Sequence, residues 1–262
     1  MKLTIIGAGN MGGAIACGLG NSKFSNELAI CCSDPLPEQL RKLKEENASI
    51  EVNTDNKTAI RGADIVIVAV KPRFVETAID DIKEALDYDK LIIISIAAGI
   101  DFFQLCRFLQ KDNKIPAIFR IIPNTAIAVR ESVNFVSSYN ATQAQTDLVK
   151  NLFNELGLTI DVDEHLLPAC TALSSCGIAY TFRYIRAAIE GAVELGIHPE
   201  LAKKIETQTL RGAITLLESN NSHPEAEIDK VTTPGGITIK GLNTMEEFGF
   251  TNAVIKGLKA SV

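Results

Sequence analysis

The 262-residue chain lacks the features that mark several classes of protein. Its net charge of -6 and its pI near 5.2 leave no basic footprint for nucleic acid, and no run of Lys and Arg marks an anionic membrane surface. No apolar run approaches the roughly 18 to 20 residues that span a bilayer, and the chain begins in a strand without a charged leader or cleavage site. We therefore expect a cytoplasmic protein with neither a nucleic-acid nor a membrane partner.

The sequence also offers no metal-binding cluster and no histidine-based triad. Its six cysteines contain no C-x-x-C pair and fall inside apolar segments, which is typical of reduced core thiols. Its three histidines are far apart and have no acidic cluster beside them. With 46% hydrophobic and 22% charged residues over this length, two globular domains are expected. Any chemistry must therefore come from other side chains.

The N-terminus carries a strand, a glycine loop and a helix. The apolar run Lys2–Ile6 leads at once into Gly7-Ala8-Gly9-Asn10-Met11-Gly12, a G-x-G-x-x-G pattern, and apolar residues at helical spacing follow. In such a loop the first glycine allows the sharp turn, the second lets a pyrophosphate approach the backbone, and the third lets the helix pack on the strand. A second strand, Leu28–Cys32, ends in Ser33-Asp34 at the distance expected for a ribose contact. The pattern predicts a dinucleotide site.

Further apolar runs predict the rest of a sheet. The β-branched run 63–70 is typical of a central parallel strand, with other runs at 50–52, 91–96 and 115–122 and an edge-like strand at 133–136. Their alternation with helices predicts an α/β fold with an N-terminal Rossmann-like, doubly wound parallel sheet. Because ligands bind at the carboxyl ends of such strands, the predicted coenzyme-binding residues are Gly7, Gly9, Asn10, Met11, Gly12, Ser33, Asp34, Asn56, Ala69, Val70, Lys71, Pro72, Ala97 and Asn124.

From Gln143 onward the pattern changes to helix almost throughout, after which only one more strand is expected, at 158–162. We predict a dinucleotide-binding Rossmann domain over residues 1–162 and an all-helical C-terminal domain for dimerisation and substrate binding over residues 163–262. The helix at 179–195 carries small residues among larger apolar ones, so other helices can approach it closely. This amount of apolar helix favours a homo-oligomer, although an internal bundle fits the same pattern.

A loop-to-helix junction near the C-terminus is the candidate substrate site. Pro234 fixes φ, Gly235 and Gly236 can adopt φ > 0, and apolar residues at helical spacing follow. Unpaired backbone N–H groups at this helix start, expected at Gly236 and Ile237, suit a small carboxylate, and the Thr238 hydroxyl lies in the first turn. An ordinary Pro-Gly helix start with an incidental threonine fits the same residues.

Glu164 is a second candidate for substrate binding. It stands at the predicted domain junction, where an acidic side chain could face a pocket between the domains. A solvated carboxylate at a helix start, favoured by the helix dipole, explains the same residue equally well.

These features together resemble pyrroline-5-carboxylate reductase along nearly the whole chain. The resemblance rests on G-A-G-N-M-G at residues 7–12, A-V-K-P at 69–72, P-N-T at 123–125 and V-T-T-P-G-G-I-T-I at 231–239, with H-P at 223–224. The chain departs from the family at residues 174–180, where S-S-C-G-I-A-Y stands for S-G-S-G-P-A-Y. It also departs at Ala126, Thr233 and Ile237.

The resemblance implies an NAD(P)H-dependent enzyme that reduces the cyclic imine 1-pyrroline-5-carboxylate to L-proline, the last step of proline biosynthesis. It also implies a homo-oligomer built from interlocked dimers. Hydride transfer to an imine needs a hydride donor, a carboxylate site and a hydroxyl beside the ring nitrogen, and it needs no metal. The expected substrate-binding residues are Glu164, Thr233, Gly235, Gly236, Ile237 and Thr238, and Thr238 is the expected catalytic residue.

The coenzyme depends on the end of the second strand. Asp34 would bond a ribose 2′-hydroxyl and repel a 2′-phosphate, whereas Ser33, with Asn56 and Lys57 nearby, could accept one. The resembled family more often uses NADPH, so we expect NADP, with NAD as a tolerated second coenzyme.

Two other classes of function are less favoured. A relative of the β-hydroxyacid dehydrogenases would carry a catalytic lysine in a glycine-spaced motif, and Lys203-Lys204 lacks such flanks. A catalytically silent nucleotide-binding sensor would account for the departures at residues 174–180 and at Ala126. A turnover assay separates these classes.

Overall fold

The computed structural model describes residues 1–262, which form two compact units, Met1–Ser175 and Cys176–Val262. The first unit contains every strand, and the second is wholly helical. The predicted domain boundary between residues 162 and 163 follows the last strand, which ends at Asp161, and it stays a prediction.

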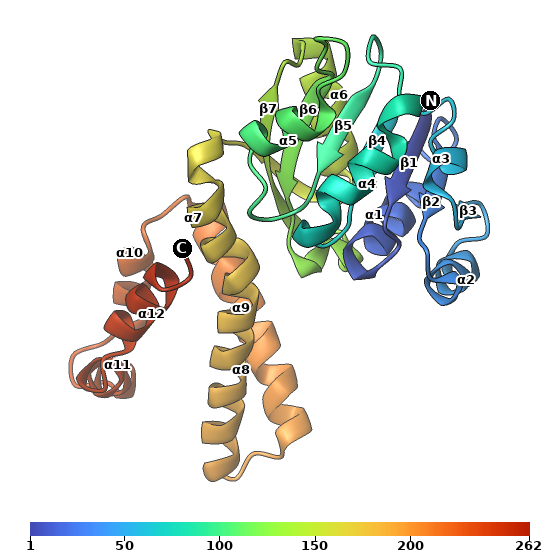
Figure 1. The fold of residues 1–262 in the computed structure, drawn as a ribbon. Coiled ribbons are helices and arrows are strands. Elements are labelled where there is room, and N and C mark those ends of the chain that lie inside the picture. Colours follow the sequence, from blue (N-terminus) through green and yellow to red (C-terminus); the bar gives the residue numbers. More distant parts are fainter. The chain divides into compact units, whose positions relative to one another are not determined.

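The first unit is built around one eight-stranded sheet in the order β3-β2-β1-β4-β5-β6-β7-β8 (Figure 1). Its strands are β1 (Lys2–Ile6), β2 (Ala29–Ser33), β3 (Glu51–Asn53), β4 (Ile65–Val68), β5 (Ile92–Ser95), β6 (Ala117–Ile122), β7 (Ser132–Tyr139) and β8 (Gly157–Asp161). Neighbouring strands are parallel except β6 and β7. The predicted Rossmann-like sheet is confirmed, and the run 63–70 lies centrally as β4, between β1 and β5.

The predicted position of residues 133–136 at the edge of the sheet is wrong. They belong to β7, which pairs with β6 on one side and with β8 on the other. Helix α6 (Gln143–Asn154) returns the chain so that β8 adds in parallel beside β7. The edge strand on this side is therefore β8, whose Leu158 is 61% exposed.

Helices cover both faces of the sheet, because successive side chains of each buried strand point to opposite faces. One apolar core joins the sheet to α1 (Asn10–Gly20), α2 (Pro37–Glu46) and α6. A second core joins the other face to α4 (Val75–Ile82) and α5 (Phe102–Leu109). The remaining short elements are α3 (Asn56–Ala59), η1 (Pro72–Phe74), η2 (Lys83–Ala85), η3 (Thr125–Val129), η4 (Glu164–Leu166) and α7 (Leu167–Thr171).

A π-helical turn, Ala172–Cys176, leads into the second unit. Its helices are α8 (Gly177–Glu194), α9 (Pro199–Asn220), α10 (Pro224–Val231), α11 (Ile237–Glu247) and α12 (Phe250–Lys259). A proline stands in the first turn of both α9 and α10, where its missing N–H costs no helical hydrogen bond. The predicted helix at 179–195 corresponds to α8, and the helix predicted to start at the Pro-Gly-Gly loop corresponds to α11.

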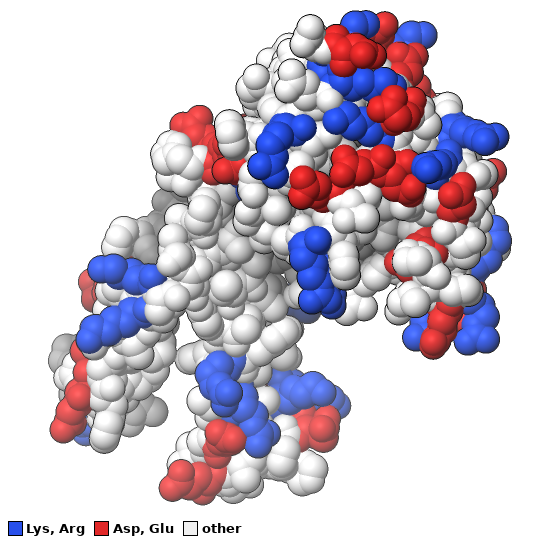
Figure 2. Space-filling view, in the orientation of Figure 1, with Lys and Arg blue, Asp and Glu red and all other residues white.

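The second unit has almost no core of its own. Ala202 is the only buried residue in Cys176–Val262, and large apolar side chains such as Leu195 and Phe248 are 83% and 85% exposed. On the face drawn in Figure 2, part of α8 is uncharged and the rest carries both charge signs, whereas the sheet unit carries both charge signs intermixed throughout. None of the helices is both long enough and apolar enough to cross a membrane.

Candidate active site

The glycine loop between β1 and α1 is shaped by contacts that exclude side chains. Gly7 has φ of +101°, and a Cβ atom there would lie 2.6 Å from the Ala69 carbonyl oxygen. At Gly12 a Cβ atom would lie 1.9 Å from the Gly7 carbonyl oxygen. Gly9 differs, because nothing lies within 4 Å of the position that its Cβ would take. Packing therefore requires glycine at positions 7 and 12, whereas Gly9 leaves open space beside the backbone.

That open space adjoins the positive end of a helix. Gly9 is the N-cap of α1, and no side chain caps this helix start. Asn10, the first residue of α1, is exposed. Unbonded N–H groups at a helix N-terminus suit a phosphate group. The loop therefore fits the diphosphate of a dinucleotide, as the sequence pattern predicts.

Asp34 lies at the end of β2 and is only 9% exposed. Its Oδ2 atom accepts a hydrogen bond from the Ala8 N–H at 2.9 Å, and its Oδ1 atom accepts one from the Leu36 N–H at 2.9 Å. The carboxylate therefore ties the second strand to the glycine loop in addition to any contact with a ribose.

Ser33 is fully buried, and its hydroxyl donates to Asn56 Oδ1 at 2.5 Å. The Asn56 amide in turn donates to Asp81 at 3.1 Å, and Lys57 pairs with the same carboxylate at 3.4 Å. The three residues predicted to contact a 2′-phosphate therefore lie close together, but each already forms a hydrogen bond or an ion pair with another side chain.

The other predicted coenzyme-binding residues follow the carboxyl ends of β4, β5 and β6. Ala69 and Val70 come after β4, and Lys71 caps η1, in which Pro72 is the first residue. These parallel strands end at the same edge of the sheet. Ala97 and Asn124 are 4% and 5% exposed, and the Asn124 side chain accepts a hydrogen bond from the Ala126 N–H at 2.9 Å. Coenzyme binding by these individual residues stays a prediction.

Glu164 forms an ion pair that the sequence did not indicate. Its Oε1 atom accepts hydrogen bonds from Arg120 Nη1 at 2.6 Å and from the Phe102 N–H at 2.6 Å. The Arg120 side chain is 8% exposed, and its Nε–H has no partner. Arg120 was missed by the sequence reasoning, although a single arginine inside the apolar run 115–122 was a signal for a buried partner. Substrate binding by Glu164 stays a prediction.

The Pro-Gly-Gly loop lies in the second unit and starts α11 as expected. Gly235 has φ of +72°, and Gly236 is the N-cap of the helix, without a side-chain cap. The expectation that the Gly236 N–H is unpaired is wrong, because it donates to the Thr233 carbonyl at 2.9 Å and closes the turn. The unpaired donors are therefore those of the first helical turn, beginning at Ile237, which is 87% exposed. Thr238 lies beside them.

All six cysteines are free, but only Cys31 and Cys32 are buried, and the other four are partly exposed. Burial raises the pKa of the Cys17 thiol to about 11, with help from the Glu46 carboxylate that its Sγ–H faces. Burial also raises the pKa of the Cys32 thiol. Thiols of this kind are poor nucleophiles at neutral pH. The chain offers no group of three or more metal-ligating side chains either.

Comparisons with known proteins agree with this geometry. A family model described as pyrroline-5-carboxylate reductase dimerisation matches residues 164–262. Pyrroline-5-carboxylate reductase 2 of Dictyostelium discoideum is 36% identical over 273 residues, covering 99% of this chain and 90% of that protein. The chain belongs to the pyrroline-5-carboxylate reductase family.

This chain covers different shares of the lengths of its relatives. Pyrroline-5-carboxylate reductase 1 of Dictyostelium discoideum is 40% identical over 99% of this chain, but the chain spans about half of that relative, 48%. A second model, described as NADP oxidoreductase coenzyme F420-dependent, matches residues 2–99. The first model covers the whole helical unit and the short helices that precede it, and the second covers the first five strands of the sheet unit.

Solved structures extend the likeness to three dimensions. The pyrroline carboxylate reductase of Plasmodium falciparum, solved with NADP bound, has a TM-score of 0.87 and 26% identity over 100% of this chain and 95% of that one. The Streptococcus pyogenes enzyme has a TM-score of 0.88 and 29% identity over 100% and 96%. Likeness to a 3-hydroxyisobutyrate dehydrogenase of Mycobacterium tuberculosis, at 15% identity and a TM-score of 0.54, covers 79% of this chain and 70% of that one and extends to the fold alone.

Proposed function

We propose that this family member reduces 1-pyrroline-5-carboxylate to L-proline by hydride transfer from NAD(P)H. The observation that carries the proposal is that one chain combines an open glycine loop at Gly9 with an uncapped helix start at Gly236. The first suits a diphosphate, and the second suits a small carboxylate. A nucleotide sensor explains the first feature but not the second. A dehydrogenase of hydroxy acids could use both, but Lys203-Lys204 lacks the glycine-spaced flanks of its catalytic lysine.

The residues divide the work of the reaction. The N–H groups at the start of α11 hold the ring carboxylate, and the Thr238 hydroxyl hydrogen-bonds the ring nitrogen. The bound coenzyme supplies the hydride that the imine carbon accepts. The ring nitrogen is protonated as the iminium, and its N–H donates to the Thr238 hydroxyl. As the carbon accepts hydride, the π electrons of the C=N bond become the nitrogen lone pair and the proton stays on nitrogen, which gives the neutral amine. Glu164, Thr233, Gly235 and Ile237 complete the proposed substrate-binding set.

The assay that tests this function follows oxidation of NADPH and of NADH by the purified full chain with 1-pyrroline-5-carboxylate as substrate. We expect oxidation that depends on the imine and yields L-proline in equal amount. Coenzyme binding without turnover would favour the sensor, and turnover with a β-hydroxyacid instead would favour the dehydrogenase.

For the coenzyme we propose NADP, with NAD tolerated. Ser33, Asn56 and Lys57 lie together at the end of β2, and a 2′-phosphate would exchange their mutual contacts for charge-assisted ones. Asp34 opposes this choice, since it brings a carboxylate to the same strand end. A preference for NADH by more than about tenfold in kcat/KM, equivalent to about 1.4 kcal/mol, would show that the Asp34 carboxylate dominates.

The partner is proposed to be a second copy of this chain, in oligomers built from interlocked dimers. Support comes from the exposed apolar side chains of α8 to α12 and from the matched dimerisation model. A cytoplasmic location is proposed as well, because six free thiols without a disulfide suit a reducing compartment.

Thr238→Ala separates the proposed catalytic role from a role in the helix start. Loss of one oriented hydrogen bond to a charged partner costs roughly 1.5 to 3 kcal/mol, so kcat/KM for the imine should fall by about tenfold to a hundredfold. Coenzyme affinity should barely change, because the dinucleotide is held by the sheet unit. Unchanged turnover per folded enzyme with a lower Tm would instead make Thr238 a scaffold residue.

A further inference from the structure

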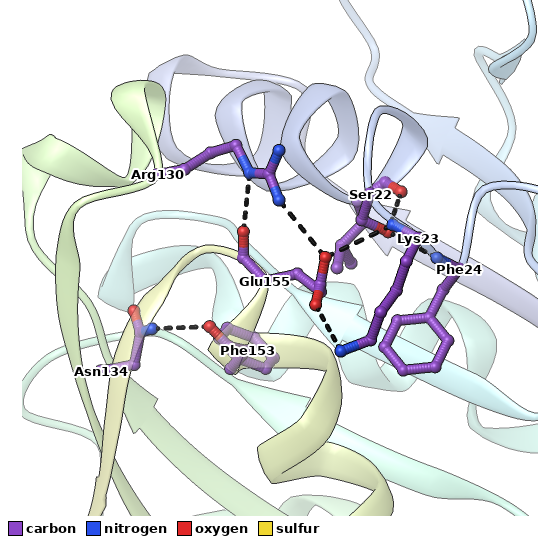
Figure 3. A network of polar contacts seen from close by, with 8 residues as sticks. Ser22, Lys23, Phe24, Arg130, Asn134, Phe153 and Glu155 are labelled. Carbon is purple, nitrogen blue, oxygen red and sulfur yellow. Dashed lines mark hydrogen bonds and ion pairs between the residues drawn. The ribbon is translucent and has the colours of Figure 1, made fainter.

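Glu155 occupies the C-terminal end of α6 and joins three segments of the sheet unit (Figure 3). Its carboxylate forms an ion pair with Lys23 Nζ at 2.8 Å and accepts hydrogen bonds from the Lys23 backbone N–H at 3.3 Å and from Arg130 Nη2 at 3.3 Å. The Glu155 carbonyl oxygen accepts a further bond from Arg130 Nε at 2.8 Å. The Glu155 side chain is 12% exposed, whereas the Lys23 and Arg130 side chains are 69% and 45% exposed, so solvent reaches the two cations more than the carboxylate that joins them. The hydrogen bond from Lys23 lowers the pKa of the Glu155 carboxyl, which is therefore charged at neutral pH.

One of the joined segments is the end of the dinucleotide helix. Lys23 follows α1, the helix whose first turn carries the open glycine loop. The same part of α1 touches the residue after Glu155, because a Cβ atom at Gly18 would lie 2.3 Å from Leu156 Cδ2. The end of α6 is thus packed against α1 as well as bonded to it.

The other joined segment is the loop after β6. Arg130 follows η3 and adopts φ of +63°, a left-handed conformation that a residue other than glycine holds only when its surroundings enforce it. This loop begins at Asn124, whose N–H donates to Ser132 Oγ at 3.0 Å, and the Ser132 N–H donates to the Leu156 carbonyl at 3.1 Å. The loop is therefore bonded to the end of α6 at two points.

The two joined segments also line one groove. A cavity of about 500 Å³ is bordered by Gly9 and Asn10 from the start of α1 and by Ala128 and Arg130 from the η3 loop. Helix α1 and η3 pack side by side along it. The spacing between the glycine loop and the Asn124 loop consequently depends on what holds η3 against α1.

We propose that Glu155 is a positioning residue for the coenzyme: by bonding Lys23 and Arg130 together, it fixes the Asn124 loop relative to the dinucleotide helix. This inference rests on the proposed function, since it takes the groove between these segments as part of the coenzyme site. Glu155 itself does not line the groove. Its contribution is the fixed spacing of two loops that do.

The experiment compares Glu155→Gln, Arg130→Gly and the double variant with the wild-type chain. Glutamine keeps the shape of Glu155 and removes its charge, and glycine at position 130 keeps the left-handed backbone without strain while removing the guanidinium. NADPH dissociation constants are measured by nicotinamide fluorescence, together with kcat, both KM values and Tm. Asp161→Asn is the matched control, because it breaks an ion pair that Lys150 of the same helix makes with β8.

We expect each single variant to raise the Kd and the KM for NADPH by roughly threefold to tenfold, with the KM for the imine unchanged. The double variant should be little worse than either single one, because both remove the same coupling. Asp161→Asn should leave the Kd unchanged. A lower Tm with an unchanged NADPH Kd in Glu155→Gln or Arg130→Gly would overturn the proposal and leave the network a purely structural one. If the wild-type chain itself neither binds nor oxidises NADPH, the proposed function fails instead.

Discussion

Gly12 and Gly9 belong to one glycine motif but meet opposite surroundings. A side chain at Gly12 would collide with the Gly7 carbonyl oxygen at 1.9 Å, whereas a side chain at Gly9 would meet no protein atom within 4 Å. The backbone at Gly9 has φ of -68°, which any residue can adopt. The absence of a side chain at Gly12 therefore serves folding, and its absence at Gly9 serves ligand approach.

We therefore expect Gly12→Ala and Gly9→Ala to fail in different ways. Gly12→Ala should lower the free energy of unfolding by roughly 1 to 3 kcal/mol, since the backbone must shift to admit a methyl group. Gly9→Ala should change stability by less than about 1 kcal/mol but weaken NADPH binding. Thermal unfolding and a fluorescence titration on each variant check both statements. Gly13→Ala is the control, because its Cβ would approach Ala8 no closer than 3.4 Å. Tight NADPH binding by Gly9→Ala would contradict the assignment of the loop.

Glu227 gives the helical unit a dependence on pH. Its carboxylate accepts hydrogen bonds from Lys230 Nζ at 2.6 Å, from the Ser222 hydroxyl and from Asn220 Nδ2 at 3.2 Å. These bonds, that from Lys230 foremost, lower the pKa of Glu227 from 4.5 to about 2. Because the folded pKa lies below the unfolded one, the contribution to stability is complete above about pH 4.5 and is lost as pH falls toward 2.

The comparison of wild type with Glu227→Gln tests this dependence. The stability difference between the two chains should be constant above about pH 4.5 and should shrink steadily as pH falls to about 2. Denaturant unfolding at a series of pH values measures it. An equal difference throughout that range would mean that the Glu227 carboxylate is not held in the folded state as described.

At the scale of secondary-structure elements, the Arg120–Glu164 ion pair connects β6, η4 and α5. Arg120 comes from β6, Glu164 begins η4, and the Phe102 N–H belongs to the first turn of α5. Asp101 and Gln104 form a capping box at the N-terminus of α5, in which each side chain accepts a hydrogen bond from the backbone N–H of the other residue. The bond from the Phe102 N–H to Glu164 satisfies a further N–H group of this first turn. The carboxylate thus anchors the chain after β8 to the sheet.

Substitution at this pair distinguishes an anchor from a substrate ligand. Glu164→Gln should lower the free energy of unfolding by roughly 1.5 to 3 kcal/mol, because it leaves the buried Arg120 charge without its partner. Replacing both residues with methionine should recover part of that loss. The KM for the imine is the deciding measurement. A KM raised at least tenfold with little loss of stability would assign Glu164 to substrate binding, as the sequence suggested.

For the whole molecule, the helical unit leaves many large apolar side chains exposed in a single copy of the chain. Its helices α8 to α12 expose large apolar side chains and bury only Ala202 in one copy of the chain. Monomeric proteins rarely expose contiguous apolar surface on this scale. We expect no stable active monomer, so sedimentation at micromolar concentration should give dimers or larger assemblies, and dilution that produces monomers should abolish activity. An active monomer would contradict this prediction.

The sequence by itself determined the features that depend on neighbouring residues. Buried parallel strands appear as continuous apolar runs, so β1, β4 and β5 were predicted to within two residues of their ends. The glycine loop and the start of α11 were predicted because proline and glycine restrict or free the local backbone. The candidate residues at the carboxyl edge of the sheet followed from these elements.

Only the tertiary structure decided which distant residues meet. The bond from Ala8 to Asp34 joins residues 26 positions apart, the pair Arg120–Glu164 joins residues 44 positions apart, and Lys23 meets Glu155 across 132 residues. The interior place of β7 likewise depends on its pairing with both β6 and β8. No local pattern specifies such pairs, because each depends on how the strands order themselves in the sheet. The unpaired Gly236 N–H was predicted wrongly for a related reason: a turn closes by the dihedral angles of several residues together, which composition alone does not fix.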